Sequence, residues 1–428
     1  MKGLLISAPQ SGSGKTLVTL ALLRALKNKG VDVCAAKAGP DFIDPGFHEK
    51  ALGKPSVNLD PWAMKPERIC ELAGALDGEL LIVEAMMGLF DGAADGSGSA
   101  ADLATILQLP IVLVLDCARQ SHSIAALVKG FNEFQQDIVI AGVILNKVGS
   151  IRHEKLLRDA LDGIGVSVLG VIPRNKDLYM PERHLGLVQA GELDGFEAFC
   201  EGAAQIIAEN CDLDALQRIG SEVRVPPDQP SSRIPPLGQR IAIARDAAFS
   251  FCYPHLLNDW RGAGVELSFF SPLHDEVPDL GADAVYLPGG YPELHGGTLA
   301  AADAFRGGMK KLAADGKLIY GECGGYMTLG EGLVDADGAR HEMLGLLALE
   351  TSFEKRKLHL GYRRVRGENF PLGANIMAHE FHYSSILCEQ GEALFEVEDA
   401  LGTDLGKAGL REGSVMGSYM HLIDVNDG

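Results

Sequence analysis

Short apolar runs alternate with amphipathic segments along the first half of the chain. Residues 17–29 (LVTLALLRALKNK) place apolar side chains at the spacing of a helix that buries one face. Nearly continuous apolar runs are instead typical of strands in a parallel sheet that is covered on both faces. Strands of this kind are expected at 3–7, 80–83, 111–115, 140–145 and 168–172. The alternation predicts a doubly wound α/β fold.

A proline-rich segment interrupts this pattern. Five prolines fall within residues 223–239, among polar residues without periodicity, which is typical of an extended linker. Buried strands are expected again at 241–244, 284–287 and 318–320. We therefore predict two doubly wound α/β domains, over residues 1–212 and 239–428, joined by a linker over 213–238.

Composition and charge narrow the class of protein. The chain has 428 residues, 46% of them hydrophobic, and a formal net charge of -20, which disfavours nucleic acid and anionic membranes as partners. An anionic substrate would need local basic groups. The eight cysteines contain no C-x-x-C pair, which argues against a zinc ribbon or a disulfide framework. With neither a signal peptide nor a membrane span in the pattern, we expect a cytoplasmic protein.

A glycine-rich loop lies between the first expected strand and the first expected helix. In Ser11-Gly12-Ser13-Gly14-Lys15-Thr16, backbone N–H groups would cradle the phosphates of ATP. Lys15 would reach the β and γ phosphates and the Thr16 hydroxyl would bind Mg²⁺. The sequence departs from the strict pattern at Pro9, where a glycine is usual. The alternative is a turn that caps the helix without a ligand.

Carboxylates occur where the expected strands end, as a magnesium site beside a phosphate requires. Each of them alone is as compatible with a helix cap or a turn as with a metal. Their joint placement favours a functional site. The candidates are Asp41, Asp44, Glu84 and Asp91, with Asp116 after a further strand.

The second half has the features of a cysteine-nucleophile site. Cys323 stands among small residues (GECGG) between an expected strand and an expected helix, which suits a nucleophile on a sharp turn. The helix N-terminus would lower the pKa of the thiol. The N–H groups of Gly324 and of Gly290 in Pro-Gly-Gly-Tyr would form an oxyanion hole, and His421 would act as the base. The alternative is a buried core thiol.

With these motifs the chain resembles the cobyrinic acid a,c-diamide synthase family, including its hydrogenobyrinic acid variant, over essentially its whole length. The first half is similar to dethiobiotin-synthetase-like P-loop domains through SGSGKT, KAGPDFIDPGFH, NLDPW, VEAMMGLFDG and GVILNKV. The second half resembles triad-class glutamine amidotransferases, which have a flavodoxin-like class I fold, through LPGGYPE, GECGGYM, HEFHYS and GSYMHL.

The resemblance implies a reaction in cobalamin biosynthesis. A corrin acetate carboxylate attacks the γ-phosphate of ATP to give an acyl phosphate, and ammonia released from glutamine at Cys323 displaces phosphate, first at the c and then at the a side chain. It implies ATP and Mg²⁺ as cofactors, and glutamine and a corrinoid acid as the small-molecule partners; the oligomeric state stays open, with a homodimer as one option. The residues that it assigns are Asn146 at adenine, Thr16, Asp41 and Glu84 at the metal, and Asp44 and Asp91 at the acyl phosphate.

Two departures from related proteins bear on the site. Triad glutaminases usually carry a glutamate two residues after the histidine, where this chain has Ile423, so the group that orients His421 is open and Glu380 is a candidate. Gln10 stands where partition-type ATPases of the same superfamily have a second lysine, which disfavours a nucleotide-gated dimer switch.

Three rival functions remain at this point. Cobyric acid synthase amidates four other side chains, but LPGGYPE and DPGFH favour the a,c-diamide enzyme. A relative that acts on nickel sirohydrochlorin is poorly separated by these motifs. The third rival is a regulatory ATPase with an inactive glutaminase module, which the intact Cys323 and His421 disfavour.

Overall fold

The chain forms two compact units, Met1–Ser231 and Ser232–Gly428. The computed structural model describes residues 1–175, 178, 182–183, 186–187, 195–225, 232–368, 370–373 and 375–425. Residues 213–222, which we expected in the linker, instead form a helix, α8 (Leu213–Ile219), and a short strand, β10 (Ser221–Glu222), of the first unit. They do so because Leu213 and Leu216 are buried in the core of that unit. Residues 226–231 of the expected linker lie outside the described part.

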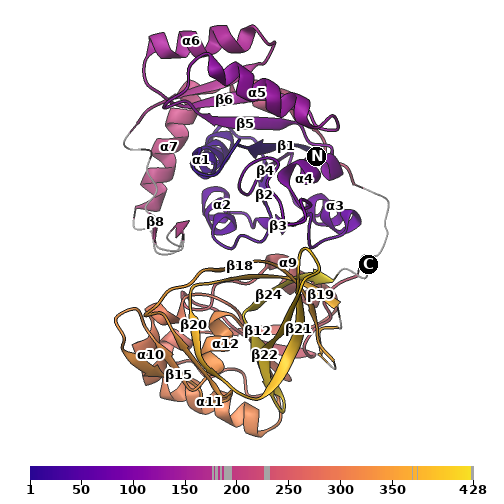
Figure 1. Ribbon diagram of the computed structural model, residues 1–428, viewed down its shortest axis with the longest axis vertical. Coiled ribbons are helices and arrows are strands. Elements are labelled where there is room, and N and C mark those ends of the chain that lie inside the picture. Colours follow the sequence, from indigo (N-terminus) through magenta and orange to yellow (C-terminus); the bar gives the residue numbers. More distant parts are fainter. Residues whose placement is uncertain are drawn as a thin grey trace. The chain divides into compact units, whose positions relative to one another are not determined.

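A mostly parallel sheet forms the centre of the first unit (Figure 1). Its strands are β1 (Lys2–Ser7), β2 (Val33–Ala38), β3 (Val57–Leu59), β4 (Leu80–Glu84), β5 (Ile111–Asp116), β6 (Ile140–Val148) and β7 (Val168–Pro173). Their order is β3-β2-β4-β1-β5-β6-β7, and β10 pairs antiparallel with β1. Two short strands, β8 (Glu182–Arg183) and β9 (Gly186–Leu187), form a separate ribbon.

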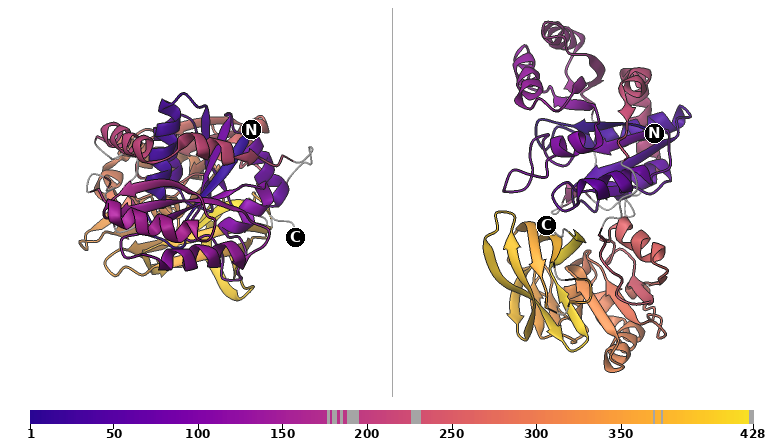
Figure 2. Two further views of the ribbon diagram at one scale, coloured as in Figure 1. Left: turned by 90° about the horizontal axis from the view of Figure 1, so that it is seen from above. Right: turned by 90° about the vertical axis from the view of Figure 1, so that its right-hand side faces the viewer.

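Helices cover both faces of this sheet (Figure 2). They are α1 (Lys15–Asn28), α2 (Asp44–Leu52), α3 (Pro66–Gly74), α4 (Ala100–Leu107), α5 (Ser123–Phe134), α6 (Ile151–Asp162) and α7 (Phe196–Asn210), together with α8. β2 and β4 are completely buried, yet each contains a charged residue, Lys37 and Glu84 respectively. These two residues are direct neighbours in the parallel register, so the fold itself brings their charges together.

A ten-stranded mixed sheet forms the centre of the second unit, in the order β12-β11-β13-β14-β23-β22-β21-β18-β19-β24. Its parallel half contains β11 (Arg240–Ala244), β12 (Glu266–Phe270), β13 (Ala284–Leu287), β14 (Leu318–Glu322) and β23 (Val415–Ser418). Its antiparallel half contains β18 (His359–Arg366), β19 (Asn375–His382), β21 (Glu392–Asp399), β22 (Asp404–Glu412) and β24 (Met420–Val425). The antiparallel half extends the flavodoxin-like arrangement that we predicted.

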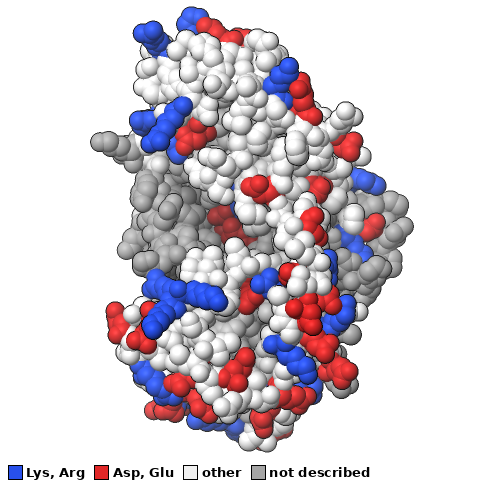
Figure 3. Space-filling view, viewed as in Figure 1, with Lys and Arg blue, Asp and Glu red and all other residues white. Residues whose placement is uncertain are grey.

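Smaller elements complete the second unit. A second sheet consists of β15 (Gly332–Val334), β16 (Arg340–Glu342), β17 (Leu349–Ser352) and β20 (Ser385–Glu389). The helices are α9 (Pro254–Gly262), α10 (Gly296–Ala301), α11 (Asp303–Ala314) and α12 (Gly324–Leu329), with short 3-10 turns η2 (Pro272–His274) and η3 (Pro292–Leu294). Among the described residues, no helix has both the length and the apolar character needed to span a membrane. On the face shown in Figure 3, acidic and basic side chains are interspersed.

Candidate active sites

The phosphate loop follows β1 and ends where α1 begins at Lys15. Gly12 and Gly14 have φ values of 79° and 87°, which glycine adopts without strain. A Cβ atom at Gly14 would also overlap the Nδ2 atom of Asn146. The Ser13 hydroxyl donates a hydrogen bond to the Gln10 carbonyl at 2.9 Å, inside the loop. The loop therefore keeps a tight shape that requires glycine, despite Pro9 at its start.

Asn146 holds this loop from the end of β6. Its Nδ2 atom donates to the Ser13 carbonyl at 3.0 Å, and its Oδ1 atom accepts from the Lys147 amide at 2.9 Å. Lys147 in turn pairs with Asp116 at 2.7 Å. In this structure Asn146 is thus a clamp on the phosphate loop, while its contact with adenine stays a prediction.

A buried cluster of charges lies beside the loop. The Thr16 hydroxyl donates to Glu84 Oε1 at 2.6 Å and lies 3.4 Å from Asp44 Oδ2. The Lys37 ammonium lies 3.1 Å from Glu84 Oε1, contacts Asp44 Oδ2, and lies 3.8 Å from Asp41 Oδ2. Hydroxyl and carboxylate oxygens gathered in this way are the hard ligands that Mg²⁺ prefers. The predicted metal residues Thr16, Asp41 and Glu84 come together here, and Asp44 joins them.

Lys37 and His48 are two members of this cluster that sequence reasoning missed. His48 is fully buried, with Nε2 2.8 Å from Glu84 Oε2 and Nδ1 3.2 Å from the Ser56 hydroxyl. A lysine within the otherwise apolar strand VCAAKA was a usable signal, because an unpaired charge is rarely buried. His48, on α2, had no comparable signal.

Two charges in this cluster, Lys37 and Glu84, hold each other in place, whereas burial and the neighbouring Asp41 raise the pKa of Asp44 despite its contact with Lys37. Burial disfavours the charge on Lys37, but Asp44 and Glu84 outweigh it and raise the pKa of Lys37 well above its ordinary value. Burial likewise opposes the charge on Glu84, yet Lys37 and His48 lower the pKa of Glu84 far below its usual range. Burial and the neighbouring Lys37 lower the pKa of Lys15. Glu84 therefore stays ionised at neutral pH, paired with the Lys37 ammonium.

Asp91 has a different setting from the other carboxylates. It is exposed, and its Oδ2 atom accepts a hydrogen bond from the Gly88 amide at 2.9 Å, closing a turn after β4. Lys15 reaches the same turn, with Nζ 3.0 Å from the Met87 carbonyl. The structure shows Asp91 as a turn former next to the phosphate loop, and its role at the acyl phosphate stays a prediction.

In the second unit, Cys323 lies on the sharp turn between β14 and α12. Its φ is 45° and its ψ is -101°, a strained conformation for a residue with a side chain. The Cys323 amide donates to the Ser418 carbonyl of β23 at 2.8 Å, which holds the turn. A Cβ atom at Gly325 would overlap the Leu287 carbonyl, so only glycine lets the turn approach β13 this closely. This geometry is the one predicted for a nucleophile.

The two expected oxyanion donors lie close together. A Cβ atom at Gly324 would be 2.9 Å from the Gly290 nitrogen, and one at Gly290 would overlap the Ala248 carbonyl. The imidazole of His421 packs against the neighbouring Gly289, where a Cβ atom would overlap its Cε1. The nucleophile turn, the Pro-Gly-Gly loop and His421 are thereby assembled in one region.

The protonation of the two groups differs in part from expectation. Burial, and then the nearby Glu293, raises the pKa of the Cys323 thiol well above its usual value, although its hydrogen bond with the Gly324 amide acts in the opposite sense. The lowering expected from the N-terminus of the short helix α12 is therefore present, at the Gly324 amide, but burial outweighs it. Burial, and then His379 and His382, lowers the pKa of His421 to about 3, so its imidazole is neutral at pH 7.

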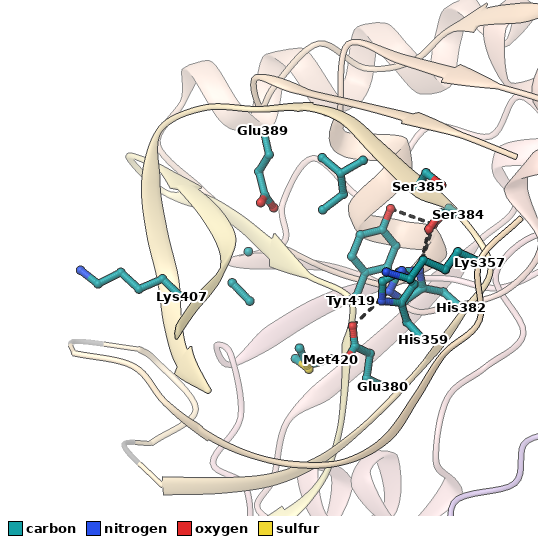
Figure 4. A pocket seen from close by; sticks show the side chains of 13 residues that line it. Lys357, His359, Glu380, His382, Ser384, Ser385, Glu389, Lys407, Tyr419 and Met420 are labelled. Atoms are coloured by element: carbon teal, nitrogen blue, oxygen red, sulfur yellow. Dashed lines mark hydrogen bonds and ion pairs between the residues drawn. The ribbon is translucent and has the colours of Figure 1, made fainter. Parts of the chain in front are cut away.

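Glu380 is not positioned to orient His421. It pairs with Arg363 at 2.7 Å and with His382 at 3.2 Å. Glu380 and His382 line a cavity of about 350 Å³ (Figure 4). In the antiparallel register of β19 and β24, Glu380 is opposite Met420, whereas His379 is opposite His421. Successive side chains of a strand point to opposite faces, so Glu380 and His421 point away from each other. Glu380 was therefore the wrong candidate for this role.

A different carboxylate lies next to His421. Glu322, the residue before the nucleophile, has Oε2 3.9 Å from Nδ1 of His421. It accepts hydrogen bonds from the Tyr286 hydroxyl at 2.9 Å and from the Leu422 amide at 3.4 Å. Glu322 was part of the GECGG motif, but nothing in the sequence showed that it meets the histidine.

Comparison with known proteins agrees with this architecture. Residues 4–188 match the family described as the CobQ/CobB/MinD/ParA nucleotide binding domain, and residues 240–428 match the CobB/CobQ-like glutamine amidotransferase domain. Curated proteins named hydrogenobyrinate a,c-diamide synthase are similar over their full length. The protein from Sinorhizobium sp. is 59% identical, with 99% of each chain covered, and that from Rhizobium meliloti is 58% identical, with 100% of each covered. This chain belongs to the hydrogenobyrinate a,c-diamide synthase family.

Membership of this family confirms the resemblance seen in the sequence. A relative from Mesorhizobium japonicum, 50% identical over 99% of this chain, bears the same name. The predicted fold class, a P-loop α/β domain followed by a glutamine amidotransferase domain, is confirmed as well.

Proposed function

We propose that this protein catalyses the ATP- and glutamine-dependent amidation of the a and c acetate carboxylates of hydrogenobyrinic acid, in cobalamin biosynthesis. The observation that carries the proposal is the presence in one chain of a glycine-rich phosphate loop beside buried carboxylates and of a strained cysteine turn beside a neutral imidazole. The name shared by its full-length relatives supports the substrate. It favours this substrate over those of cobyric acid synthase and of the nickel sirohydrochlorin enzyme.

The first unit would activate the carboxylate. Ser11, Gly12, Ser13 and Gly14 would hold the phosphates of ATP, and Lys15 would neutralise the charge that develops on the transferred phosphoryl group. Thr16, Asp41 and Glu84 fit Mg²⁺, which when bound neutralises phosphate charge. Asp44 and Asp91 would border the acyl phosphate. Lys37, held among carboxylates, supplies a second cation close to the transferred group.

The second unit would release ammonia. His421 takes the proton of Cys323, and the thiolate attacks the side-chain amide carbon of glutamine. The amide N–H groups of Gly290 and Gly324 stabilise the oxyanion of the tetrahedral intermediate. His421 then returns the proton to the departing nitrogen, leaving a thioester on Cys323 and free ammonia. Water hydrolyses the thioester to glutamate, and the ammonia displaces phosphate from the acyl phosphate to form the new amide.

Product analysis tests the substrate assignment. The protein is incubated with hydrogenobyrinic acid, ATP, Mg²⁺ and glutamine, and the products are identified by mass spectrometry. Two carboxyl groups should be converted to amides. Conversion of four, or activity on nickel sirohydrochlorin alone, would refute the assignment and favour a rival.

Two variants separate the half-reactions. Cys323→Ala should abolish glutamine-supported amidation and retain turnover with an added ammonium salt, because the first unit is intact. Lys15→Ala should abolish both, because phosphoryl transfer is lost. Full glutamine-dependent activity in Cys323→Ala would show that another group is the nucleophile.

A further inference from the structure

Glu322 occupies a buried polar position directly behind the nucleophile. Its side chain is 2% exposed, as is that of His421. The Tyr286 hydroxyl donates to Oε2, and the Leu422 amide of β24 lies 3.4 Å from Oε1. A carboxyl group fixed on both oxygens in this way has little freedom to rotate. It therefore presents Oε2 to His421 in a defined direction.

The geometry matches what a base histidine requires from an acid partner. Oε2 of Glu322 is 3.9 Å from Nδ1 of His421, within ion-pair range and about 1 Å longer than a hydrogen bond. Catalytic hydrogen bonds are often long in ligand-free enzymes and tighten when substrate binds. A carboxylate at Nδ1 keeps the proton on that nitrogen and leaves Nε2 free to accept the proton of the thiol.

The position that normally supplies this acid is apolar here. Two residues after His421 the chain has Ile423, which is buried, and Glu380 lies on the other face of β19. β14 carries Glu322 next to β23, and the chain continues from β23 through Tyr419 directly into β24. The fold therefore delivers a carboxylate to His421 from the strand that carries the nucleophile.

We propose that Glu322 is the positioning residue for His421, completing a Cys323–His421–Glu322 triad in which the acid immediately precedes the nucleophile in the sequence. This inference rests on the glutaminase function proposed above. It adds to that function the group that fixes the tautomer of the base and stabilises the imidazolium form during proton transfer.

The surroundings of Glu322 set the pH at which it acts. Burial raises the pKa of Glu322 to about 8, while the hydrogen bonds from Tyr286 and Leu422 oppose that rise. The other titratable groups that face the pair are Cys252 and Cys323 beside Glu322, and His379 and His382 beside His421. Only the ionised carboxyl stabilises an imidazolium, so the glutaminase rate should increase as the pH rises through about 8. The apparent pKa belongs to the coupled cluster.

The test is the pH dependence of glutamine hydrolysis in the full-length Glu322→Gln variant. The glutamine side chain at position 322 keeps the shape of the glutamate and an oxygen that accepts from Tyr286, but it cannot ionise. We expect kcat to fall by about 100-fold or more while KM for glutamine changes little, and the increase in kcat/KM near pH 8 to disappear. Glu322→Asp should have a higher kcat than Glu322→Gln, and its kcat/KM should again increase with pH.

Glu380→Gln serves as the matched control, because it also removes a partly buried carboxylate from this unit but not one beside Nδ1 of His421. Glu380→Gln should retain the increase in kcat/KM near pH 8. Wild-type kcat/KM and an unchanged pH profile in Glu322→Gln would overturn the inference. If Glu322→Gln does not fold, Tyr286→Phe replaces it. Loss of the Tyr286 hydroxyl should raise the pKa of Glu322 further and move the increase in kcat/KM to higher pH. If this increase stays at the wild-type pH, the inference is overturned as well.

The outcomes separate the two proposals. If Cys323→Ala still hydrolyses glutamine, the proposed function of the second unit fails. If Cys323→Ala is inactive and Glu322→Gln behaves like the wild type, only the role of Glu322 fails.

Discussion

The buried ammonium of Lys37 should make a large contribution to the stability of the first unit. Lys37→Met keeps the length of the side chain but removes the cation that contacts Asp44 and Glu84. Because Lys37 and Glu84 are 2% and 0% exposed, water cannot replace the lost partner. Removing one member of a buried ion pair typically costs about 3–5 kcal/mol. We therefore expect the free energy of unfolding of this unit to fall by about that amount at pH 7.

The two tryptophans allow the unit to be followed separately. Trp62 is buried in the first unit and Trp260 in the second, so a shared Trp260→Phe background leaves a single reporter. With a urea m-value of about 2–3 kcal/mol/M, the expected loss moves the unfolding midpoint of Trp62 fluorescence down by about 1–2.5 M. Lys54→Met is the matched control, because the Lys54 ion pair with Asp32 is on the surface. That control should leave the midpoint nearly unchanged.

Two further readings test the physical reason for the effect. The pKa of Glu84 is lower in the folded protein than in the unfolded chain. The pairing of its carboxylate therefore stabilises the folded protein at pH values above the pKa of an ordinary glutamate, and this stabilisation is lost as the pH falls. The difference in the free energy of unfolding between the wild type and Lys37→Met should therefore become smaller below about pH 4. Millimolar Mg²⁺ should stabilise Lys37→Met more than the wild type, since the same oxygens are then open to the metal. An unchanged midpoint at pH 7, or equal effects of Mg²⁺ on both proteins, would refute this reasoning.

Two other substitutions test the loops. Gly325→Ala should reduce the steady-state rate of glutamine-dependent amidation at least tenfold, because the added methyl group overlaps the Leu287 backbone. Gly307→Ala is the control, because its Cβ position in α11 has open space around it, and it should leave this rate unchanged. Asn146→Ala should raise KM for ATP by about tenfold by removing the hydrogen bond to the Ser13 carbonyl, and unchanged ATP kinetics would contradict the clamp.

Most of the parallel strands were predicted from the sequence, although β2, β3, β12 and β23 were not. The expected strand at 80–83 corresponds to β4 (Leu80–Glu84), that at 284–287 to β13 (Ala284–Leu287), and that at 168–172 to β7 (Val168–Pro173). A parallel strand covered on both faces is apolar along most of its length, so it stands out in the sequence as a short apolar run. The strands of the antiparallel half were not predicted, and β18, β21 and β22 among them mix buried with exposed positions. β18, with the sequence HLGYRRVR, lacks any such run.

The candidate site was predictable where a motif carries its own geometry. The phosphate loop and the turn at Cys323 each require glycines at fixed spacing, and the structure shows backbone conformations and close approaches that explain them. Lys37 and Glu322 could not be assigned in this way. Their roles depend on which strands become neighbours, β2 with β4 and β14 with β23, and that information is not local in the sequence.

The position of β23 has a consequence for how activity is acquired during synthesis. This late strand enters between β14 and β22, and its Ser418 carbonyl anchors the amide of Cys323. His421 follows three residues later. Chains fold from the N-terminus as they are translated. A ribosome-bound chain that still lacks this strand has the thiol but neither its anchor nor its base, so glutamine consumption can start only after the residues through His421 have been synthesised.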